Sequence, residues 1–114
     1  MEETRLKVFV IDGVPLVRAG IASLVRGVPG WRVEGEFDTA ADALIGGQGR
    51  VPDVIVLDRA LSDQVGVSTI AELRRAYGNA RILMFAGYPN ERHVLEAFAA
   101  GAHGYALRGE HPKN

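Results

Sequence analysis

The feature that most constrains this chain is a regular alternation of short apolar runs with longer segments of helical periodicity. This alternation is typical of a parallel sheet whose two faces are covered by helices. The runs that we predict as strands span residues 6–11, 31–37, 54–57, 82–85 and 104–107. The third and fourth runs are almost entirely apolar, as central strands are, whereas the second alternates with polar residues and is predicted to lie at an edge.

Each gap between the predicted strands contains a segment with helical features. The first predicted helix begins at Pro15, carries Val17, Ile21 and Leu24 at helical spacing and is stopped by Pro29-Gly30. A short second helix is capped by Asp38 or Thr39 and ends at Gly46-Gly47. A third spans residues 67–77 with Ile70, Leu73 and Tyr77 on one face, and a fourth lies between Pro89 and Gly101. The resulting order predicts an α/β fold, a doubly wound, flavodoxin-like three-layer sandwich with a five-stranded parallel sheet in the order 2-1-3-4-5.

Composition and charge exclude several classes of protein. The 114 residues suit a single domain, and the absence of cysteine excludes disulfide frameworks, thiolate metal sites and cysteine nucleophiles. A net charge of −1 argues against a nucleic-acid-binding surface within the chain. The longest apolar runs, such as residues 54–57, are far shorter than the roughly 18 residues of a membrane span. We therefore expect a cytoplasmic protein that does not contact a membrane.

Two aspartates follow predicted strands at the positions where chemistry collects in this class of fold. Asp12 follows the first strand and Asp58 follows the third. If these strands are neighbours, both carboxylates lie at the switch point of the sheet, where they can attract a hard cation or share a proton. The alternative is structural, since each aspartate can instead cap the turn or helix that follows it.

Three stretches, at residues 10–20, 52–58 and 97–108, together with Gly66, carry a likeness that extends over nearly the whole chain. With them the sequence resembles the receiver domain of bacterial response regulators, especially those attached to LuxR-type helix-turn-helix output domains. The resemblance implies a receiver at residues 1–108. It also implies that residues 109–114 are a tail leading to a fifth helix, missing from this chain, and to a DNA-binding output domain outside it.

The resemblance further implies a function in signalling and not as an enzyme. Asp58 would accept a phosphoryl group from a sensor histidine kinase, beside a Mg²⁺ ion held by Asp12, Asp58 and the main-chain carbonyl of Ala60. Many receivers form homodimers through the fourth helix and fifth strand, and Tyr105 matches the family's switch aromatic. Contact with DNA would come only through the output domain.

Several positions of the pocket depart from the family's pattern. Gly13 stands where a second acidic residue usually ligates the metal, and Ala86 stands where a Ser or Thr hydroxyl bonds the phosphoryl group. Arg108 replaces a lysine, and its forked guanidinium is not equivalent to an ammonium. We therefore predict a degenerate pocket with weak or absent Mg²⁺ binding, in an atypical receiver that is not governed by ordinary phosphorylation.

Two alternatives remain open from the sequence. Asp58 can be phosphorylated in the conventional way but weakly, or the chain can be a pseudo-receiver that binds a small molecule or dimerises. Other polar residues suggest no site. His93, His103 and His111 are spaced too irregularly for a metal centre and are predicted to be solvated, as are Arg74 and Arg75 on the third helix.

Overall fold

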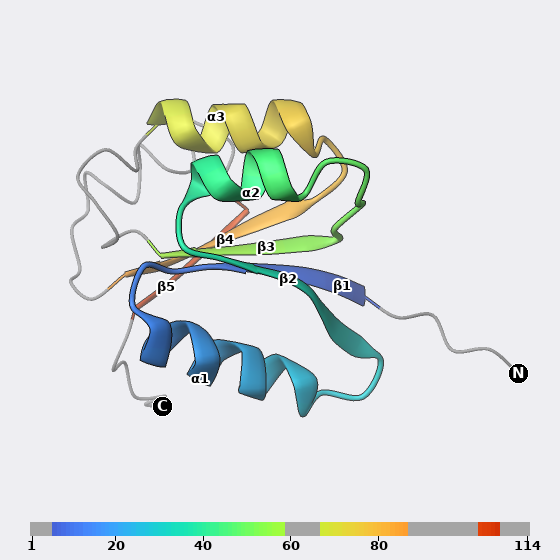
Figure 1. Ribbon diagram of the computed structural model, residues 1–114, viewed down its shortest axis with the longest axis vertical. Helices are drawn as coiled ribbons and strands as arrows, with labels where there is room; N and C mark the ends of the chain where they lie inside the picture. Colours follow the sequence, from blue (N-terminus) through green and yellow to red (C-terminus); the bar gives the residue numbers. More distant parts are fainter. Residues whose placement is uncertain (1–5, 59–66, 87–102, 108–114) are drawn as a thin grey trace, which may run out of the picture.

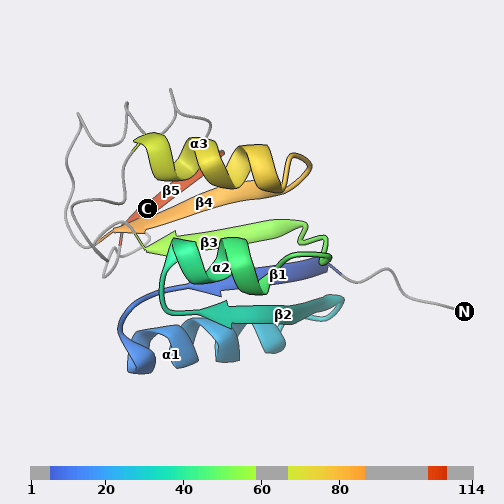
Figure 2. The same ribbon diagram turned by 45° about the horizontal axis from the view of Figure 1, so that its top comes forward.

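The computed structural model describes residues 6–58, 67–86 and 103–107. They contain a parallel sheet in the order β2-β1-β3-β4-β5, which confirms the predicted topology (Figures 1 and 2). The strands are β1 (Leu6–Ile11), β2 (Trp31–Phe37), β3 (Val54–Asp58), β4 (Arg81–Ala86) and β5 (Gly104–Leu107). β2 and β5 form the two edges, as Figure 2 shows.

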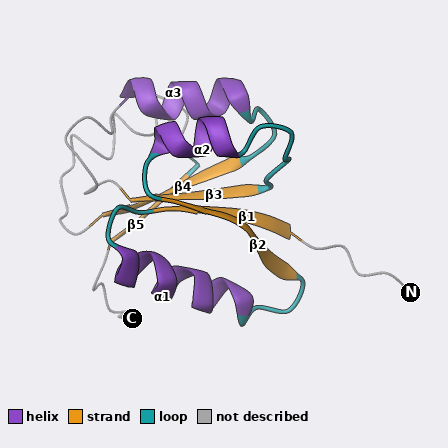
Figure 3. Ribbon diagram, viewed as in Figure 1, coloured by secondary structure: helices purple, strands orange, loops and turns teal. Residues whose placement is uncertain are grey.

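Helices cover both faces of the sheet, so the three-layer sandwich is also confirmed. They are α1 (Pro15–Arg26), α2 (Ala40–Gly46) and α3 (Val67–Ala76). α1 lies on one face, and α2 and α3 lie on the other (Figure 3). The helix predicted between Pro89 and Gly101 lies outside the described residues, as do the 109–114 tail, His93 and His111. None of the helices in the described ranges is long and apolar enough to cross a membrane.

The core-facing side of α1 differs from the prediction. The helix begins at Pro15, whose fixed φ suits the first turn, and buries Ala22 and Val25 against the sheet. Leu24 is 75% exposed, although its spacing from Ile21 had suggested an inward position. At 100° per residue, an inward face centred between Ala22 and Val25 turns Leu24 toward solvent.

The start of α2 decides between two caps that the sequence left open. The Oγ1 atom of Thr39 accepts a hydrogen bond from the Asp42 N–H at 3.0 Å, and so satisfies a backbone donor that the first turn leaves unpaired. Thr39 is therefore the cap. The carboxylate of Asp38 is left to pair elsewhere.

The larger of two hydrophobic clusters lies between the sheet and the helices α2 and α3. At its centre the ring of Phe9 makes edge-to-face contacts with Phe37 at 5.1 Å and Tyr77 at 5.4 Å between ring centroids. The Tyr77 hydroxyl donates to the Ala43 carbonyl at 2.8 Å. Burial raises the pKa of Tyr77, and the charge of Arg50 opposes this shift. The phenol therefore stays protonated and keeps α2 against the core.

The strand β2 contributes to both clusters because its pairing with β1 is irregular. Val8 pairs with Val33, but the next residue, Phe9, pairs with Gly35, so Glu34 is an extra residue on β2. The Glu34 carbonyl accepts from Arg50 Nη1 at 2.7 Å. Before this bulge Val33 packs in the smaller cluster, on the side of α1, and after it Phe37 packs against the larger one.

His103, which directly precedes β5, is exposed but is not simply solvated as predicted. Its Nδ1 accepts a hydrogen bond from the Ile82 N–H at 3.0 Å, and its Nε2 lies 3.0 Å from Arg74 Nη1. The His103 N–H also donates to the Ile82 carbonyl at 2.8 Å. Partial burial lowers the pKa of His103, and the charges of Arg74 and Arg81 lower it further. The neutral ring therefore connects the entry of β5 to β4.

This contact predicts a dependence of stability on pH. Below about pH 6.5 an unfolded histidine takes up a proton that the native His103 ring resists, so the free energy of unfolding falls as the pH falls toward the native pKa. We expect urea unfolding from about pH 7.5 to about pH 5 to show a steeper loss in the wild type than in His103→Asn. The Asn Oδ1 keeps an acceptor for Ile82 but does not titrate, so equal slopes would contradict this assignment.

Candidate functional site

The carboxyl ends of the parallel strands meet at one edge of the sheet. Ile11 of β1 is aligned with Leu57 of β3, so the residues that follow them, Asp12 and Asp58, come to neighbouring positions of the backbone. β1 and β3 are also the strands between which the winding direction reverses, since β2 lies on the other side of β1. The structure thus places the main chain of both aspartates at the switch point, where ligands of this fold class bind.

Asp12 is completely buried, and one of its oxygens holds the turn that leads into α1. Its Oδ1 accepts a hydrogen bond from the Val14 N–H at 2.9 Å. Asp12 therefore caps the turn that follows β1, which is the structural role that the sequence left open as an alternative for this residue. Gly13, the next residue, adds no side-chain ligand, so the end of β1 supplies a single carboxylate.

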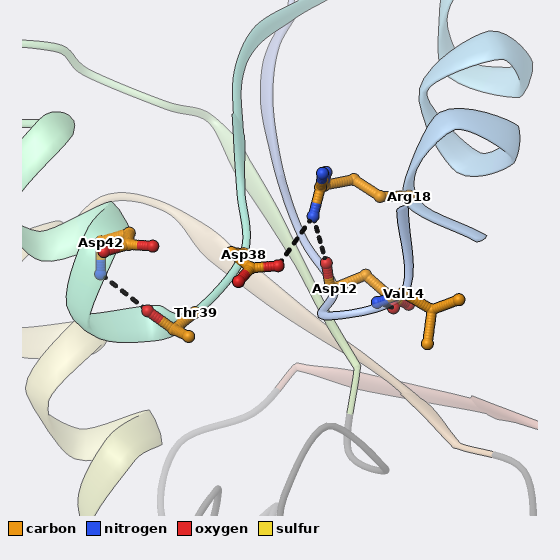
Figure 4. A network of polar contacts seen from close by, with 6 residues as sticks. All are labelled: Asp12, Val14, Arg18, Asp38, Thr39 and Asp42. Carbon is orange, nitrogen blue, oxygen red and sulfur yellow. Dashed lines mark hydrogen bonds and ion pairs between the residues drawn. The ribbon is translucent and has the colours of Figure 1, made fainter. Parts of the chain in front are cut away.

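Arg18 lies next to this turn, and its contacts there were not predicted from the sequence. Its Nη1 donates to the main-chain carbonyl of Asp12 at 2.7 Å and to Asp38 Oδ1 at 3.1 Å (Figure 4). The side chain of Arg18 is 21% exposed, against 60% for Asp38. One guanidinium thus connects the first turn of α1, the end of β1 and the loop after β2. The only sequence feature that points to this role of Arg18 is its position one turn into the helix that follows the strand-end aspartate Asp12.

Replacing Arg18 tests how much this contact stabilises the end of β1. We expect Arg18→Gln to lower the free energy of unfolding by about 1–2 kcal/mol, because the carbonyl of the buried Asp12 loses a charged donor. Asp38→Asn should cost less than about 1 kcal/mol, since that pair is largely solvated. Urea unfolding measures both. Arg26→Gln is the matched control, because among the described residues Arg26 pairs with the exposed Glu36 and donates to no buried carbonyl. Equal losses for Arg18→Gln and Arg26→Gln would contradict the assignment.

The other predicted site residues are placed only in part. Ala86 is the last residue of β4 and pairs with Leu107, and Tyr105 of β5 pairs with Met84, so both belong to the strands that form this edge. Ala60 and Arg108 lie outside the described residues. Of Asp58, the structure describes the backbone, at the end of β3.

The number of acidic side chains at this edge of the sheet determines how well the expected Mg²⁺ ion could be held. Within residues 6–58, 67–86 and 103–107, no group of three or more His, Asp or Glu side chains is placed to hold a metal ion. Mg²⁺ keeps several waters and needs only one or two carboxylates. If Mg²⁺ binds at this edge beside Asp58, the end of β1 offers it the carboxylate of Asp12 alone, one oxygen of which already accepts from Val14, so most of its ligands would be water.

Comparison with known proteins gives a consistent result. Residues 8–113 match the model of the response regulator receiver domain. The DNA-binding transcriptional activator DevR/DosR of Mycobacterium tuberculosis is 33% identical over 103 residues, which cover 90% of this chain and 48% of that protein. The chain spans about half the length of the curated relatives it matches.

Solved structures agree with this match. A LuxR-family two-component response regulator from Aurantimonas superimposes with a TM-score of 0.85 at 31% identity, covering 94% of this chain and 76% of that one. The signal receiver domain of the putative response regulator NarL from Mycobacterium tuberculosis gives a TM-score of 0.84 at 28% identity, with 95% and 87% covered. Both similarities cover more than nine-tenths of this chain.

Proposed function

Because this chain belongs to the family of response regulator receiver domains, we propose that it is an atypical receiver, in which Asp58 occupies the phosphoacceptor position beside a degenerate pocket. One observation carries this proposal. The end of β1 supplies only the carboxylate of Asp12, and one oxygen of that carboxylate already accepts from Val14. A pocket with so little negative charge offsets poorly the cost of removing water from a divalent cation.

The remaining pocket residues support the same proposal. In a conventional receiver reaction, a carboxylate oxygen such as that of Asp58 attacks the phosphorus of a phosphohistidine, and the histidine of the kinase leaves. Mg²⁺, when bound, would reduce the repulsion between the carboxylate and the phosphoryl oxygens. Ala86 has no hydroxyl to donate to a phosphoryl oxygen. Arg108 would supply charge there with a geometry unlike that of lysine. We therefore propose weak Mg²⁺ binding and a conformation that phosphorylation does not chiefly control.

The proposal extends to partners. As a receiver, the domain would take its input from a sensor histidine kinase or from a protein or small ligand that replaces it, in the cytoplasm. β5 forms one edge of the sheet, which supports a homodimer built through β5 and the segment before it. Any contact with DNA would be made by an output domain, in keeping with the net charge of −1 of this chain.

Chemical phosphorylation tests the proposal directly. The wild type and Asp58→Ala are incubated with acetyl phosphate and Mg²⁺, and their intact masses are measured over time. We expect little or no Asp58-dependent gain of one phosphoryl group. A conventional receiver of known activity, treated in parallel, shows that the donor is competent. Rapid and complete phosphorylation that disappears in Asp58→Ala would overturn the proposal and establish an ordinary phosphorylation switch.

A further inference from the structure

A hollow lies between two loops at the end of the sheet opposite Asp58. The loop from α2 to β3 and the turn from α3 to β4 meet there (Figures 1 and 2). The hollow has a volume of about 170 Å³, opens to solvent and is lined by residues 50–52 and 76–79. A cavity of about 150 Å³ can hold one benzene molecule. The hollow is therefore large enough for a small organic ligand.

Much of the lining of this hollow is apolar and already fixed in place. Pro52 is completely buried, and Tyr77 is only 9% exposed. The ring of Tyr77 packs edge-to-face on Phe9, and its hydroxyl donates to the Ala43 carbonyl. Val51 is 59% exposed and so has apolar surface free to contact a ligand. Because these side chains are held by the fold, ligand binding costs little ordering of the protein.

The hollow contains one charged side chain, that of Arg50, and none of its lining residues is acidic. Nη1 of Arg50 donates to the main-chain carbonyl of Glu34 at 2.7 Å, which orients the guanidinium without neutralising its charge. In the part of the chain that the structure describes, no carboxylate forms an ion pair with Arg50. A guanidinium has five N–H donors, so those of Nε and Nη2 can serve a ligand. The Arg50 charge also opposes the rise in the pKa of Tyr77, so it acts on the same wall of the hollow.

We propose that this hollow binds a small monocarboxylic acid whose apolar body is an aromatic ring or a short branched chain. The carboxylate accepts from Nε and Nη2 of Arg50, a charge-assisted pair of bonds that matches the fork of a guanidinium. The apolar body contacts Val51, Pro52 and Tyr77. The carboxyl end of α3 carries a partial negative charge, smaller than the full charge of Arg50. This difference orients the ligand, with its carboxylate at Arg50 and its apolar body toward Ala76.

This inference goes beyond the proposed function, because the hollow does not include Asp58. The hollow lies at the amino ends of β3 and β4, whereas Asp58 lies at the carboxyl end of β3. Arg50 bonds to the bulge of β2, and Tyr77 bonds to α2. A bound acid would therefore connect both to the turn after α3. It should stabilise the fold by mass action whether or not Asp58 is phosphorylated.

A titration followed by NMR tests the inference. Sodium benzoate and, separately, benzamide are added to the ¹⁵N-labelled chain at about pH 7, where a carboxylate is ionised, and sodium chloride keeps the ionic strength constant. We expect benzoate to shift the amide signals of Val51, Gly78 and Asn79 in a saturable way, with a Kd on the order of 1 mM. Benzamide has the same ring without the charge and should bind about tenfold more weakly. Benzoate shifts that do not saturate, or equal affinity for the two compounds, would overturn the inference.

Arginine variants separate recognition by the hollow from general attraction to positive charge. Arg50→Gln should weaken benzoate binding by about tenfold or more, because the carboxylate loses its charged donors. Arg75→Gln is the matched control, since it removes the same charge from an exposed position beside the lining residue Ala76. It should leave the affinity within about twofold. Equal losses in the two variants would show that no specific site is present.

Apolar variants test the other half of the site and do not depend on the bond from Arg50 to β2. Val51→Ala should weaken benzoate binding by about threefold, because part of the apolar contact is lost. Ile45→Ala, at a 71% exposed position outside the lining, should change nothing. Asp58→Ala should bind as the wild type does, so a failure of the proposed pocket chemistry leaves this result unaffected. Unchanged binding in Val51→Ala, or lost binding in Asp58→Ala, would place the ligand elsewhere and contradict the inference.

Discussion

A chain that carries Gly13→Asp together with Ala86→Thr is expected to become phosphorylated at Asp58 about 100-fold faster than the wild type when acetyl phosphate and Mg²⁺ are supplied. The two changes address different deficits of the proposed pocket. A carboxylate at position 13 adds negative charge beside Asp12 and strengthens Mg²⁺ binding. A hydroxyl at position 86, at the end of β4, adds a donor for a phosphoryl oxygen, and a positioned donor of this kind is worth about 100-fold in rate.

The single variants and a triple variant make this prediction specific. Each single change should give part of the increase, and Mg²⁺ titration should show tighter binding whenever Asp is present at position 13. Adding Asp58→Ala to the double variant should abolish the mass gain. If the double variant is phosphorylated no faster than the wild type, Gly13 and Ala86 do not limit the chemistry, and the proposed cause of the atypical pocket is wrong.

The second large effect is expected in the core. Gly47→Ala should lower the free energy of unfolding by about 3 kcal/mol. Gly47 is buried directly after α2, and a Cβ atom there would meet the Tyr77 hydroxyl, the Ala43 carbonyl at 2.7 Å and Phe9 Cε2 at 2.8 Å. The carbonyl is main chain and accepts the Tyr77 hydroxyl, so neither group can withdraw without breaking a buried hydrogen bond.

Gly20→Ala is the matched control for this experiment. Gly20 lies within α1 and is exposed, and a Cβ atom built on it meets nothing within 4 Å beyond its chain neighbours and its own helix backbone. The same chemical change should therefore stabilise the chain, by about 0.5–1 kcal/mol, because alanine favours helix over glycine. Urea unfolding of both variants gives the comparison. A Gly47→Ala chain as stable as the wild type would show that the contacts around Tyr77 are loose.

Much of the fold could be predicted because it depends on signals that are local in sequence. The β2 and β5 bounds, the start of α1 at Pro15 and the end of α2 at Gly46 follow from apolar runs, proline and glycine. The choice between Asp38 and Thr39 could not be made in the same way, since either side chain can cap a helix. It depended on the presence of a tertiary partner for Asp38, the guanidinium of Arg18.

In the candidate site, too, the residues with local sequence signals could be predicted, and those that depend on tertiary contacts could not. Asp12 and Asp58 could be found because strand ends are visible in the sequence and the parallel order brings them together. The role of Arg18 could not, because its partners come from two loops that only the folded chain brings together. His103 was misjudged for a similar reason. An isolated histidine gives no sign that one ring nitrogen will face a backbone amide of β4 and the other an arginine of α3.

The bulge at Glu34 has a consequence for how β2 tolerates change. Along an uninterrupted strand every second side chain faces the same way, yet Val33 and Phe37, an even number of positions apart, serve opposite layers. The alternation of side chains between the two faces of the sheet therefore shifts by one residue at Glu34. Deleting that one residue would leave the composition of β2 almost unchanged but would turn Phe37 away from Phe9 and toward α1. For the packing of this edge strand, the number of residues in β2 therefore matters more than the identity of the residue at position 34.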